Sequence, residues 1–426
     1  MAREAIDHSV LNDENVIYIE NEYIRLGINL ALGGVVTYLA ERGRPNLINS
    51  HDWGRQVQMS FYSHPVPFRP EGVDMVEAWR EIGWNPIQCG DCFGHRSTLL
   101  EHRCSDGEIY VKCIPMHWPL DNYPGECTFE TWYKLNGTQV EVTARLNNAR
   151  PDTTQYPARS QELPAVYTNG VWYKLVSYIG SEPGTGGPVT EICNKENGLG
   201  WPWESYQATE NWSALVDDDN YGLGVFNPIT NTTIGGFAGE MGSGGPKDGN
   251  TGYISPILPE ILDHDIVYTY SYALIVGDLE HIRASALALR QQHACWSFEQ
   301  DRSHFTYRGT TDAGLPKNGC LEFAFVQENA LVSPPQFIPA GSSRILLDAA
   351  LCGGELPCTL RLNCSESTSY RMGKENFAVW EISAVLAADG QRRIHTLDIS
   401  GAPAGVGFEL IFGGKGSAQV WSVCVE

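Results

Sequence analysis

Short runs in which apolar and polar residues alternate, separated by glycine, proline or asparagine, recur along most of the chain. Residues 16–20 read VIYIE, residues 23–28 read YIRLGI, and two longer runs flank Asn136-Gly137 in the pattern of a hairpin. A period of two residues is that of a strand with one buried face. Abundant glycine (44 residues), proline (24) and aromatic residues (11%) suit short strands and frequent turns better than helix bundles. We therefore predict an all-β fold whose opening strands form the edge of a large antiparallel sheet.

One stretch departs from the strand pattern. Residues 278–292 (DLEHIRASALALRQQ) carry apolar residues at helical spacing, lack internal glycine and proline, and begin at Asp278, a suitable N-cap. We expect a helix here that leads towards a domain boundary, because 426 residues exceed one typical hydrophobic core. After Trp296, strand-like runs follow at regular intervals, which is typical of a β-sandwich. The prediction is two domains, residues 1–292 and residues 293–426.

Charge and cysteine usage restrict the partners and the compartment. The net charge of −22, without a basic stripe, argues against nucleic acid and disfavours a strongly anionic polysaccharide. No apolar run reaches membrane-spanning length, and the N-terminus has no basic start followed by an apolar core. Twelve irregularly spaced cysteines favour reduced thiols over a disulfide framework. We expect a cytoplasmic protein that contacts neither membrane nor nucleic acid and that can form a homo-oligomer.

No cofactor or metal site is predicted. Cys89 and Cys92 form a CxxC, but zinc needs two further ligands and only His95 is near in sequence. The acidic run at residues 217–219 is interpreted as a solvated hairpin turn or a weak cation site, without a second cluster at calcium-loop spacing. We find no dinucleotide or phosphate-binding fingerprint.

Polar side chains and aromatic rings are concentrated between residues 46 and 97. A sugar offers hydroxyls that forked polar groups can bracket and apolar C–H faces on which aromatic rings stack. Residues 148–170 form a second segment of this kind. We predict that both are loops bordering a saccharide-binding cleft, since long loops in compact domains are usually functional. The polar and tryptophan side chains of the first segment include His51, Asp52, Arg55, Gln56, Gln58, Trp84, Asn85, Gln88, Asp91 and His95.

The run NWSALVDDDNYGLGVFNP (residues 211–228), with the later strand DIVYTYSYALIVG (residues 265–277), resembles the galactose-mutarotase-like β-supersandwich families. These include aldose epimerases, glycoside hydrolase domains and polysaccharide lyase domains, and the resemblance covers roughly residues 15–277. It implies a large antiparallel β-supersandwich with the saccharide across the concave face of the large sheet. The C-terminal strands resemble the smaller β-sandwich often appended to carbohydrate-active enzymes.

The chain departs from the aldose epimerases at one position. Those enzymes carry a catalytic Glu before their closing strands. In the matching region, TGYISPILPEILD, Tyr253 stands where that residue is expected and Glu260 fits poorly. The resemblance therefore does not imply simple mutarotase activity.

Hydrolysis of a glycosidic bond normally needs two carboxyl groups, one that donates a proton and one that is ionised. Glu162 is the first candidate, and its alternative is a surface residue capping a turn. Asp91 lies between two glycines that allow close approach of a ligand, and its alternative is an Asx-turn. Asp52 either contacts sugar or braces its loop by pairing with Arg55. Glu210 opens a strand, a position more often structural than catalytic.

We predict a glycoside hydrolase acting on an oligosaccharide or small glycoside. The first alternative is a polysaccharide lyase, in which Tyr123, Tyr167 or a histidine abstracts the proton beside a uronate carboxylate that Arg55 or Gln88 neutralises. The second is a non-catalytic sugar-binding or assembly protein. Seven further side chains are predicted to position the sugar: Arg55, Gln58, Trp84, Gln88, His95, His117 and Tyr167.

Overall fold

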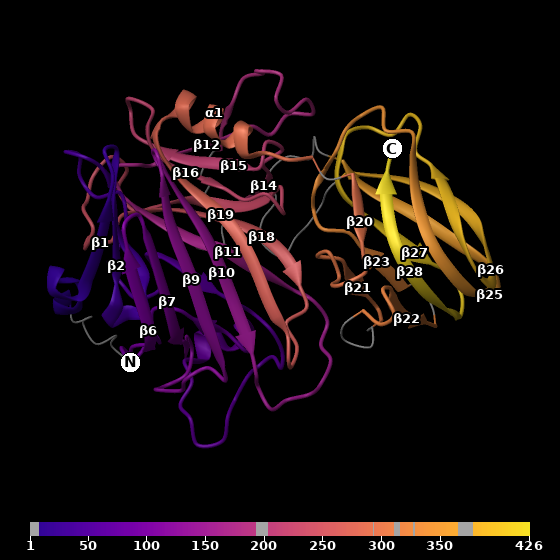
Figure 1. Cartoon of the computed structure of the whole chain (residues 1–426), viewed down its shortest axis with the longest axis horizontal. Coiled ribbons are helices and arrows are strands. Elements are labelled where there is room, and N and C mark those ends of the chain that lie inside the picture. Colours follow the sequence, from indigo (N-terminus) through magenta and orange to yellow (C-terminus); the bar gives the residue numbers. More distant parts are fainter. Residues whose placement is uncertain (1–7, 193–202, 293, 311–315, 327–328, 365–377) are drawn as a thin grey trace.

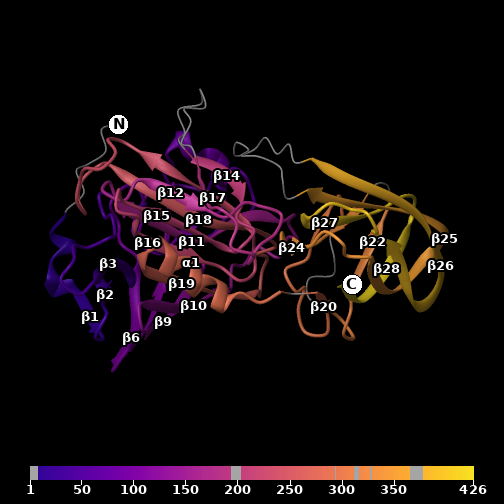
Figure 2. The same cartoon turned by 90° about the horizontal axis from the view of Figure 1, so that it is seen from above.

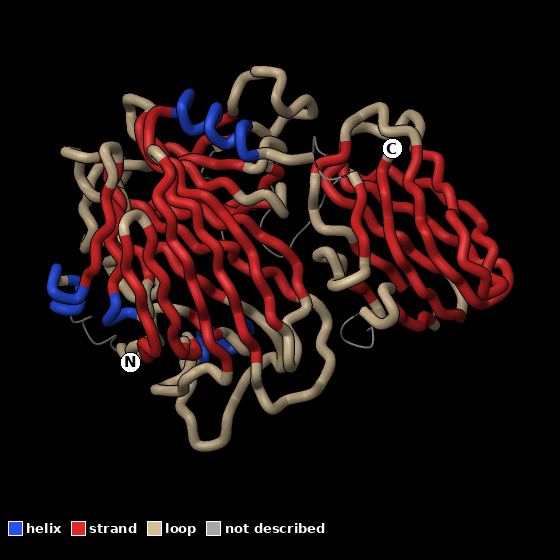
Figure 3. Tube along the Cα trace, in the orientation of Figure 1, coloured by secondary structure: helices blue, strands red, loops and turns tan. Residues whose placement is uncertain are grey.

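Three sheets hold almost all of the regular structure (Figures 1 and 3). The computed structural model describes residues 8–192, 203–292, 294–310, 316–326, 329–364 and 378–426. The strand pairings in the three sheets are antiparallel, so the predicted all-β fold with large antiparallel sheets is confirmed. Short 3-10 helices span His8–Leu11, Asp13–Asn15, Leu30–Leu32 and Glu77–Ile82.

The first sheet has ten strands and begins with the predicted opening strands. β1 pairs with β2 from Val16↔Asn29 to Glu20↔Arg25 and forms one edge of the sheet, as expected. Two short strands, β5 (Pro86–Ile87) and β8 (Met116–His117), extend from β4. The order across the sheet is β1 (Val16–Glu20), β2 (Ile24–Asn29), β3 (Val35–Glu41), β4 (Val57–Ser60), β11 (Arg159–Asn169), β18 (Thr251–Glu260), β17 (Thr232–Ala238) and β14 (Trp203–Gln207).

The second sheet has nine strands. Its β9–β10 hairpin turns at Asn136-Gly137 as predicted, and Gly137 supplies the positive φ of +59° that this turn needs. The order is β13 (Thr190–Glu191), β12 (Lys174–Ser177), β15 (Trp212–Val216), β16 (Tyr221–Phe226), β19 (Val267–Asp278), β10 (Gln139–Asn148), β9 (Cys127–Asn136), β7 (Glu108–Ile114) and β6 (Thr98–Ser105).

The first and second sheets pack face to face around one apolar core. Phe61, which follows β4, lies with its ring centroid 5.3 Å from that of Phe129 on β9. Tyr268, Tyr270 and Tyr272 alternate along β19, and all three are buried in this core. The two-residue period of a strand explains why all three tyrosines share one face of β19.

Three strands lie where loops were predicted, the short β5 and two strands at the centre of the sheet. β4 falls within residues 46–97 and β11 within residues 148–170, and the two are neighbours in the middle of the first sheet. Pro164 made β11 difficult to recognise from the sequence, because a proline argues against a central strand. The structure places Pro164 in a register shift between Glu162 and Val166, where the ladder of hydrogen bonds is interrupted. Both segments therefore contribute strands to the sheet itself as well as loops at its border.

The predicted helix is confirmed as α1 (Leu279–Leu289), which ends three residues before the predicted boundary. Asp278 is its N-cap and accepts a hydrogen bond from the His281 backbone N–H at 2.8 Å. Ile282 and Ala286 form its buried face. Among the described residues, no helix is both long and apolar enough to cross a membrane.

The third sheet is built from residues 295–425 and contains two very long strands. The expectation of short strands only is wrong here, since β25 has 21 residues and β26 has 20. Gly353 and Gly390, which suggested turns, lie at register shifts where both strands continue. The strands are β20 (Cys295–Ser297), β21 (Thr306–Arg308), β22 (Leu321–Phe325), β23 (Asn329–Val332), β24 (Phe337–Ile338), β25 (Arg344–Cys364), β26 (Val379–Asp398), β27 (Gly405–Phe412) and β28 (Gly416–Val425).

Cys295 and Cys424 form a disulfide that joins β20 to β28. The expectation that the cysteines are all reduced thiols is therefore wrong for this pair, whose separation of 129 residues conceals it in the sequence. Seven other described cysteines are free thiols: Cys89, Cys104, Cys113, Cys127, Cys320, Cys352 and Cys358.

The third sheet lies beside the first and second sheets (Figures 1 and 2). Asn231 links them, since its backbone N–H donates to the Pro335 carbonyl at 2.7 Å and its side chain accepts from the Phe337 N–H at 2.8 Å. His304 Nδ1 lies 3.1 Å from a Glu260 carboxylate oxygen across the same junction.

Candidate functional site

One face of the first sheet points away from the main core and carries a row of aromatic rings. On β11, Val166 packs into the main core whereas Tyr167 lies on the opposite face. The register places Tyr253 of β18 directly opposite Tyr167, and their ring centroids are 4.7 Å apart. Trp203 of β14 reaches Tyr253 across Gly236 of β17, with ring centroids 5.0 Å apart. We call this row of Tyr167, Tyr253 and Trp203 the aromatic face.

Glu162, the first carboxyl candidate, lies half-buried on β11 beside the aromatic face. Its Oε2 accepts a hydrogen bond from the Tyr62 hydroxyl at 2.9 Å, and its Oε1 accepts one from the Tyr253 hydroxyl. Ser60 of β4 lies opposite Glu162 and donates to the Tyr62 hydroxyl at 3.2 Å. Gln161 fixes Tyr62, because its amide bonds both the N–H and the carbonyl of that residue at 2.8 Å. The Glu162 carboxyl group is thus held between two phenols.

The tyrosines around Glu162 stay protonated. Burial raises the pKa of Tyr62, Tyr167 and Tyr253 well above the usual value, and the negative charge of Glu162 raises all three further. A phenol with a raised pKa keeps its proton at neutral pH, so its hydroxyl can donate a hydrogen bond but supplies little phenolate to act as a base. The site therefore offers one carboxyl group surrounded by hydroxyl donors.

Asp52 and Arg55 lie on the loop that leads into β4. Asp52 Oδ2 is 3.2 Å from Arg55 Nε, so the bracing ion pair weighed as an alternative is present. Arg55 also donates to the Gly249 carbonyl at 2.9 Å, which ties this loop to residues 239–250. Both side chains remain partly exposed, 22% for Asp52 and 17% for Arg55. The negative charge of Asp52 raises the pKa of Tyr167 and the positive charge of Arg55 lowers it, so both charges lie close to the aromatic face.

Asp91 has a different environment from Glu162. Its side chain is fully buried, and its Oδ1 accepts from the backbone N–H groups of Phe93 and His95, both at 2.9 Å. Its Oδ2 accepts from the Asn122 N–H and lies 2.9 Å from His95 Nδ1. The Asx-turn weighed as an alternative is therefore what the structure contains.

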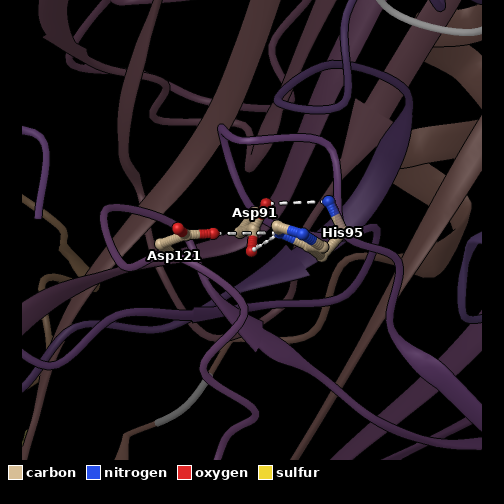
Figure 4. A group of neighbouring side chains, drawn as sticks. All are labelled: Asp91, His95 and Asp121. Carbon is tan, nitrogen blue, oxygen red and sulfur yellow. Dashed lines mark hydrogen bonds and ion pairs between the residues drawn. The ribbon is translucent and has the colours of Figure 1, made fainter. Parts of the chain in front are cut away.

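Figure 4 shows Asp91, His95 and Asp121 as one group, with ligand-type atoms that lie within 4.8 Å of one another. Asp121 Oδ1 is 3.4 Å from His95 Nδ1. Hydrogen bonds to N–H groups already occupy both oxygens of Asp91, which accounts for this geometry. None of these bonds involves Glu162, so the structure does not join the two carboxyl candidates.

Gln58 and Gln88 lie inside the protein, with exposures of 2% and 1%. Gln58 donates to two loop carbonyls and accepts from the Cys89 N–H at 3.0 Å. Gln88 accepts from the Met59 N–H at 3.1 Å and donates to the Gly33 carbonyl at 3.0 Å. Side chains this deeply buried, with the amide oxygen and nitrogen both bonded to backbone, present no group at the surface to a sugar. This revises the predicted sugar contacts, since both side chains support the loops beneath the site.

Trp84 and His117 are also buried, and they surround a carboxylate that the sequence did not single out. One oxygen of Glu126 lies 3.1 Å from His117 Nε2 and 3.3 Å from Trp84 Nε1, while Tyr123 donates to the other at 3.3 Å. Burial lowers the pKa of His117, although the hydrogen bond to Glu126 opposes this shift. Burial alone would raise the pKa of Glu126, but the His117 and Trp84 hydrogen bonds outweigh it and lower that pKa. Trp84 and His117 thus leave the predicted sugar-positioning set and become internal supports.

A groove of about 840 Å³ lies on the outer face of the second sheet. Tyr110 and Trp132 are two of the aromatic residues that line it, and their ring centroids are 5.1 Å apart. The Arg103 guanidinium lies 4.2 Å from the Tyr110 centroid, and the Arg145 guanidinium lies 5.0 Å from the Trp132 centroid. Because cations already cover these rings, the groove is less suited to stacking a sugar than its size suggests.

Solved structures with a similar arrangement of strands include proteins named as aldose 1-epimerases, a galactose mutarotase-like protein and polysaccharide lyases. The chain resembles galactose-mutarotase-like proteins. A putative aldose 1-epimerase from Escherichia coli K12 is 13% identical, with 62% of this chain and 99% of that chain covered and a TM-score of 0.38. A galactose mutarotase-like protein from Lactobacillus casei has the same identity and TM-score, with 61% and 99% covered. A heparan sulfate lyase from Pedobacter heparinus is 8% identical, with 71% and 37% covered and a TM-score of 0.30.

No family model matches the chain, and no curated protein matches it. The galactose-mutarotase-like proteins are those that the sequence resemblance pointed to. At identities and TM-scores this low, the likeness says nothing about the chemistry of this chain. The functional proposal therefore rests on the geometry of the site.

Three residues of the candidate site were not predicted as site residues: Tyr62, which bonds Glu162, and Trp203 and Tyr253 of the aromatic face. Alternation in the run GYISPIL carried a signal for Tyr253, since it identifies the residues that share one face of β18. The partnership of Glu162 with Tyr62 and Tyr253 depends on the register of β4, β11 and β18, which no local pattern reveals.

Proposed function

We propose that this protein is a carbohydrate-active enzyme that hydrolyses a glycosidic bond in an oligosaccharide or small glycoside. The observation that carries the proposal is the half-buried Glu162 carboxyl group held between the phenols of Tyr62 and Tyr253 beside the aromatic face. A carboxyl group among aromatic rings and hydroxyl donors is well placed to exchange a proton with a sugar oxygen.

The surroundings of Glu162 suit a neutral sugar. Tyr167 is half-buried and presents a ring on which the C–H face of a sugar can stack. Asp52 and Arg55 are partly exposed and can bracket hydroxyl groups at the border. The net charge of −22 disfavours a polyanionic substrate.

Within this proposal, Glu162 and Asp52 divide the two roles of a hydrolase. Asp52 forms an ion pair with Arg55, so it takes the role that requires an ionised carboxylate. Glu162 takes the role of proton donor to the leaving oxygen, since its neighbours are phenols and aromatic rings rather than cations. Asp91 is not part of the pair, because backbone N–H groups engage both of its oxygens.

Elimination on a uronate is the second candidate, because the charge of Arg55 lies near Tyr167, a residue type that can serve as the base in such a reaction. The pKa values disfavour it. Burial, the largest cause, raises the pKa of Tyr62, Tyr167 and Tyr253, which leaves little of the phenolate form that would take a proton from carbon. Hydrolysis requires no phenolate and is therefore the better supported reaction.

The two reactions give different products, so one assay separates them. The purified full-length chain is incubated with neutral oligosaccharides and with uronate-containing polysaccharides, and both reducing ends and ultraviolet absorbance are followed. We expect new reducing ends from a neutral oligosaccharide without an ultraviolet band. An absorbing, unsaturated product from a uronate polymer would instead establish elimination. Saccharide binding without turnover of any substrate would leave a binding protein.

A further inference from the structure

One edge of the long β25–β26 hairpin faces away from the rest of the protein. β26 pairs with β25 from Val379↔Asn363 to Asp398↔Arg344, and within the described ranges no strand pairs with its other edge. Figures 1 and 2 both place the two strands at the end of the molecule remote from the first and second sheets. Backbone groups along a strand of 20 residues are thus presented to a further strand.

The outer strand lacks two of the features that usually protect such an edge, although it carries charged side chains and a bulge. It is long and contains no proline. Val379, Val385 and Ile394 are exposed to 48%, 65% and 64%. They are three of the nine exposed large apolar side chains among the described residues, so this one strand carries an unusual share. This concentration marks β26 as an interaction surface.

A bulge divides β26 into two halves with opposite alternation. Odd-numbered side chains are exposed from Val379 to Ala387, and even-numbered ones from Arg392 to Asp398. The ladder explains the change: Cys352↔Asp389 is followed by Ala350↔Arg392, so a step of two residues on β25 spans three on β26.

The bulge makes the strand match a second copy of itself. When two β26 strands run antiparallel with Leu386 facing the partner's Leu386, each bulge falls opposite residues near position 382. Each bulge shifts the pairing between the two strands by one residue. Because the exposed residues of β26 change from odd-numbered to even-numbered at the same place, exposed positions face exposed positions in both halves, as an antiparallel pair requires.

The side chains also agree in this register. Val379 meets the partner's Ile394, and Glu381 meets the partner's Arg392, while no like charges meet between residues 379 and 394. Each charge already has a partner within its own hairpin. Glu381 accepts from Arg361 at 2.6 Å, and Arg392 donates to Asp348 at 2.6 Å. Dimerisation would therefore join existing ion pairs into a network without burying an unpaired charge.

We propose that two copies of this chain pair through β26 into a twofold-symmetric dimer whose sheet continues across the interface. The occupant is a second copy rather than a foreign strand, because bulge position, apolar pairs and charges all match under a twofold axis. The edge lies in the third sheet and the aromatic face in the first, so this proposal is independent of the proposed hydrolysis.

Sedimentation velocity of the full-length chain over a wide concentration range tests the proposal. We expect the wild-type protein to show twice its monomer mass of 47.1 kDa. Val379→Glu and Ile394→Lys should each give monomers, because a charge then faces an apolar side chain at both ends of the interface. An equal mixture of the two variants should recover a dimer, since the new carboxylate faces the new ammonium group.

The matched control is Val326→Lys, which introduces the same side chain at a position exposed to 66% that follows β22 rather than lying in β26. It should remain dimeric, and all three variants should keep the wild-type Tm. A non-reducing gel checks that the exposed thiols of Cys104 and Cys352 do not crosslink the chains. A monomeric wild-type protein, single variants that stay dimeric, or a mixture that stays monomeric would each overturn the proposal.

Discussion

Glu162→Gln should lower kcat by about 10²- to 10⁴-fold on an unactivated glycoside, the range that a general acid contributes. Glutamine keeps the shape of the side chain and can still bond the hydroxyls of Tyr62 and Tyr253, so KM and Tm should change little. It cannot give a proton to the leaving oxygen. Steady-state kinetics of the wild-type protein and the variant measure kcat and KM, and thermal melting measures the Tm of each.

Substrates with activated leaving groups separate the proposed acid from the proposed ionised carboxylate. Fluoride departs without a proton, so Glu162→Gln should retain much of its activity on a glycosyl fluoride, whereas Asp52→Asn should lose activity on both substrates. Glu191→Gln makes the same chemical change at an exposed position of β13 and should leave kcat unaltered. Near-normal hydrolysis of an unactivated glycoside by Glu162→Gln would remove Glu162 from the mechanism.

Glu210→Gln should destabilise the fold by about 3–5 kcal/mol, the usual cost of removing one member of a buried ion pair. The Glu210 side chain is fully buried, and Arg283 donates to both of its oxygens at 2.9 and 2.7 Å. Gly184 N–H and Trp212 Nε1 also donate to it, both at 2.9 Å. A glutamine would turn an N–H₂ group towards these donors and leave the Arg283 cation without its counter-ion. Urea unfolding measures the loss of free energy.

The ion pair of Glu210 with Arg283 also makes the stability of the fold depend on pH in the acid range. Burial alone would raise the pKa of Glu210, but the hydrogen bonds from Arg283, Gly184 and Trp212 outweigh it and hold that pKa below its usual value of 4.5. A depressed pKa in the folded state stabilises the protein above the unfolded pKa, and this stability is lost as the pH falls through the folded pKa. The free energy of unfolding of Glu210→Gln should therefore depend less steeply on pH below about 4.5 than that of the wild-type protein. Glu77→Gln, which disrupts the exposed pair with Arg80, should leave both the slope and the Tm unchanged.

Local patterns predicted the elements whose signals are local. The opening strands, the hairpin at Asn136-Gly137 and helix α1 with its Asp278 cap all depend on neighbouring residues, and all were found. β11 was missed because Pro164 and the polar residues of its site-facing side disguise its alternation. The continuity of β25 and β26 was missed because glycine serves equally in a turn and in a bulge.

The candidate site was predictable only in part, for a related physical reason. Glu162 and Tyr167 were identified because their residue types suit a sugar, and the structure places both on one side of β11. Tyr62, Tyr253 and Trp203 join them through strand pairings between residues far apart in the chain. Gln58, Gln88, Trp84 and His117 have equally suitable chemistry, but burial turns it inwards, and composition does not reveal burial.

A crystal structure of the Glu162→Gln variant soaked with a neutral oligosaccharide is the most direct test that the saccharide binds at the aromatic face beside residue 162. We expect a sugar ring against Tyr167, with a glycosidic oxygen about 2.6–3.2 Å from the side chain at position 162. We also expect a hydroxyl group within reach of Asp52 or Arg55. A saccharide bound instead in the groove beside Tyr110 and Trp132, with the aromatic face empty, would contradict the proposal that Glu162 and the aromatic face form the active site.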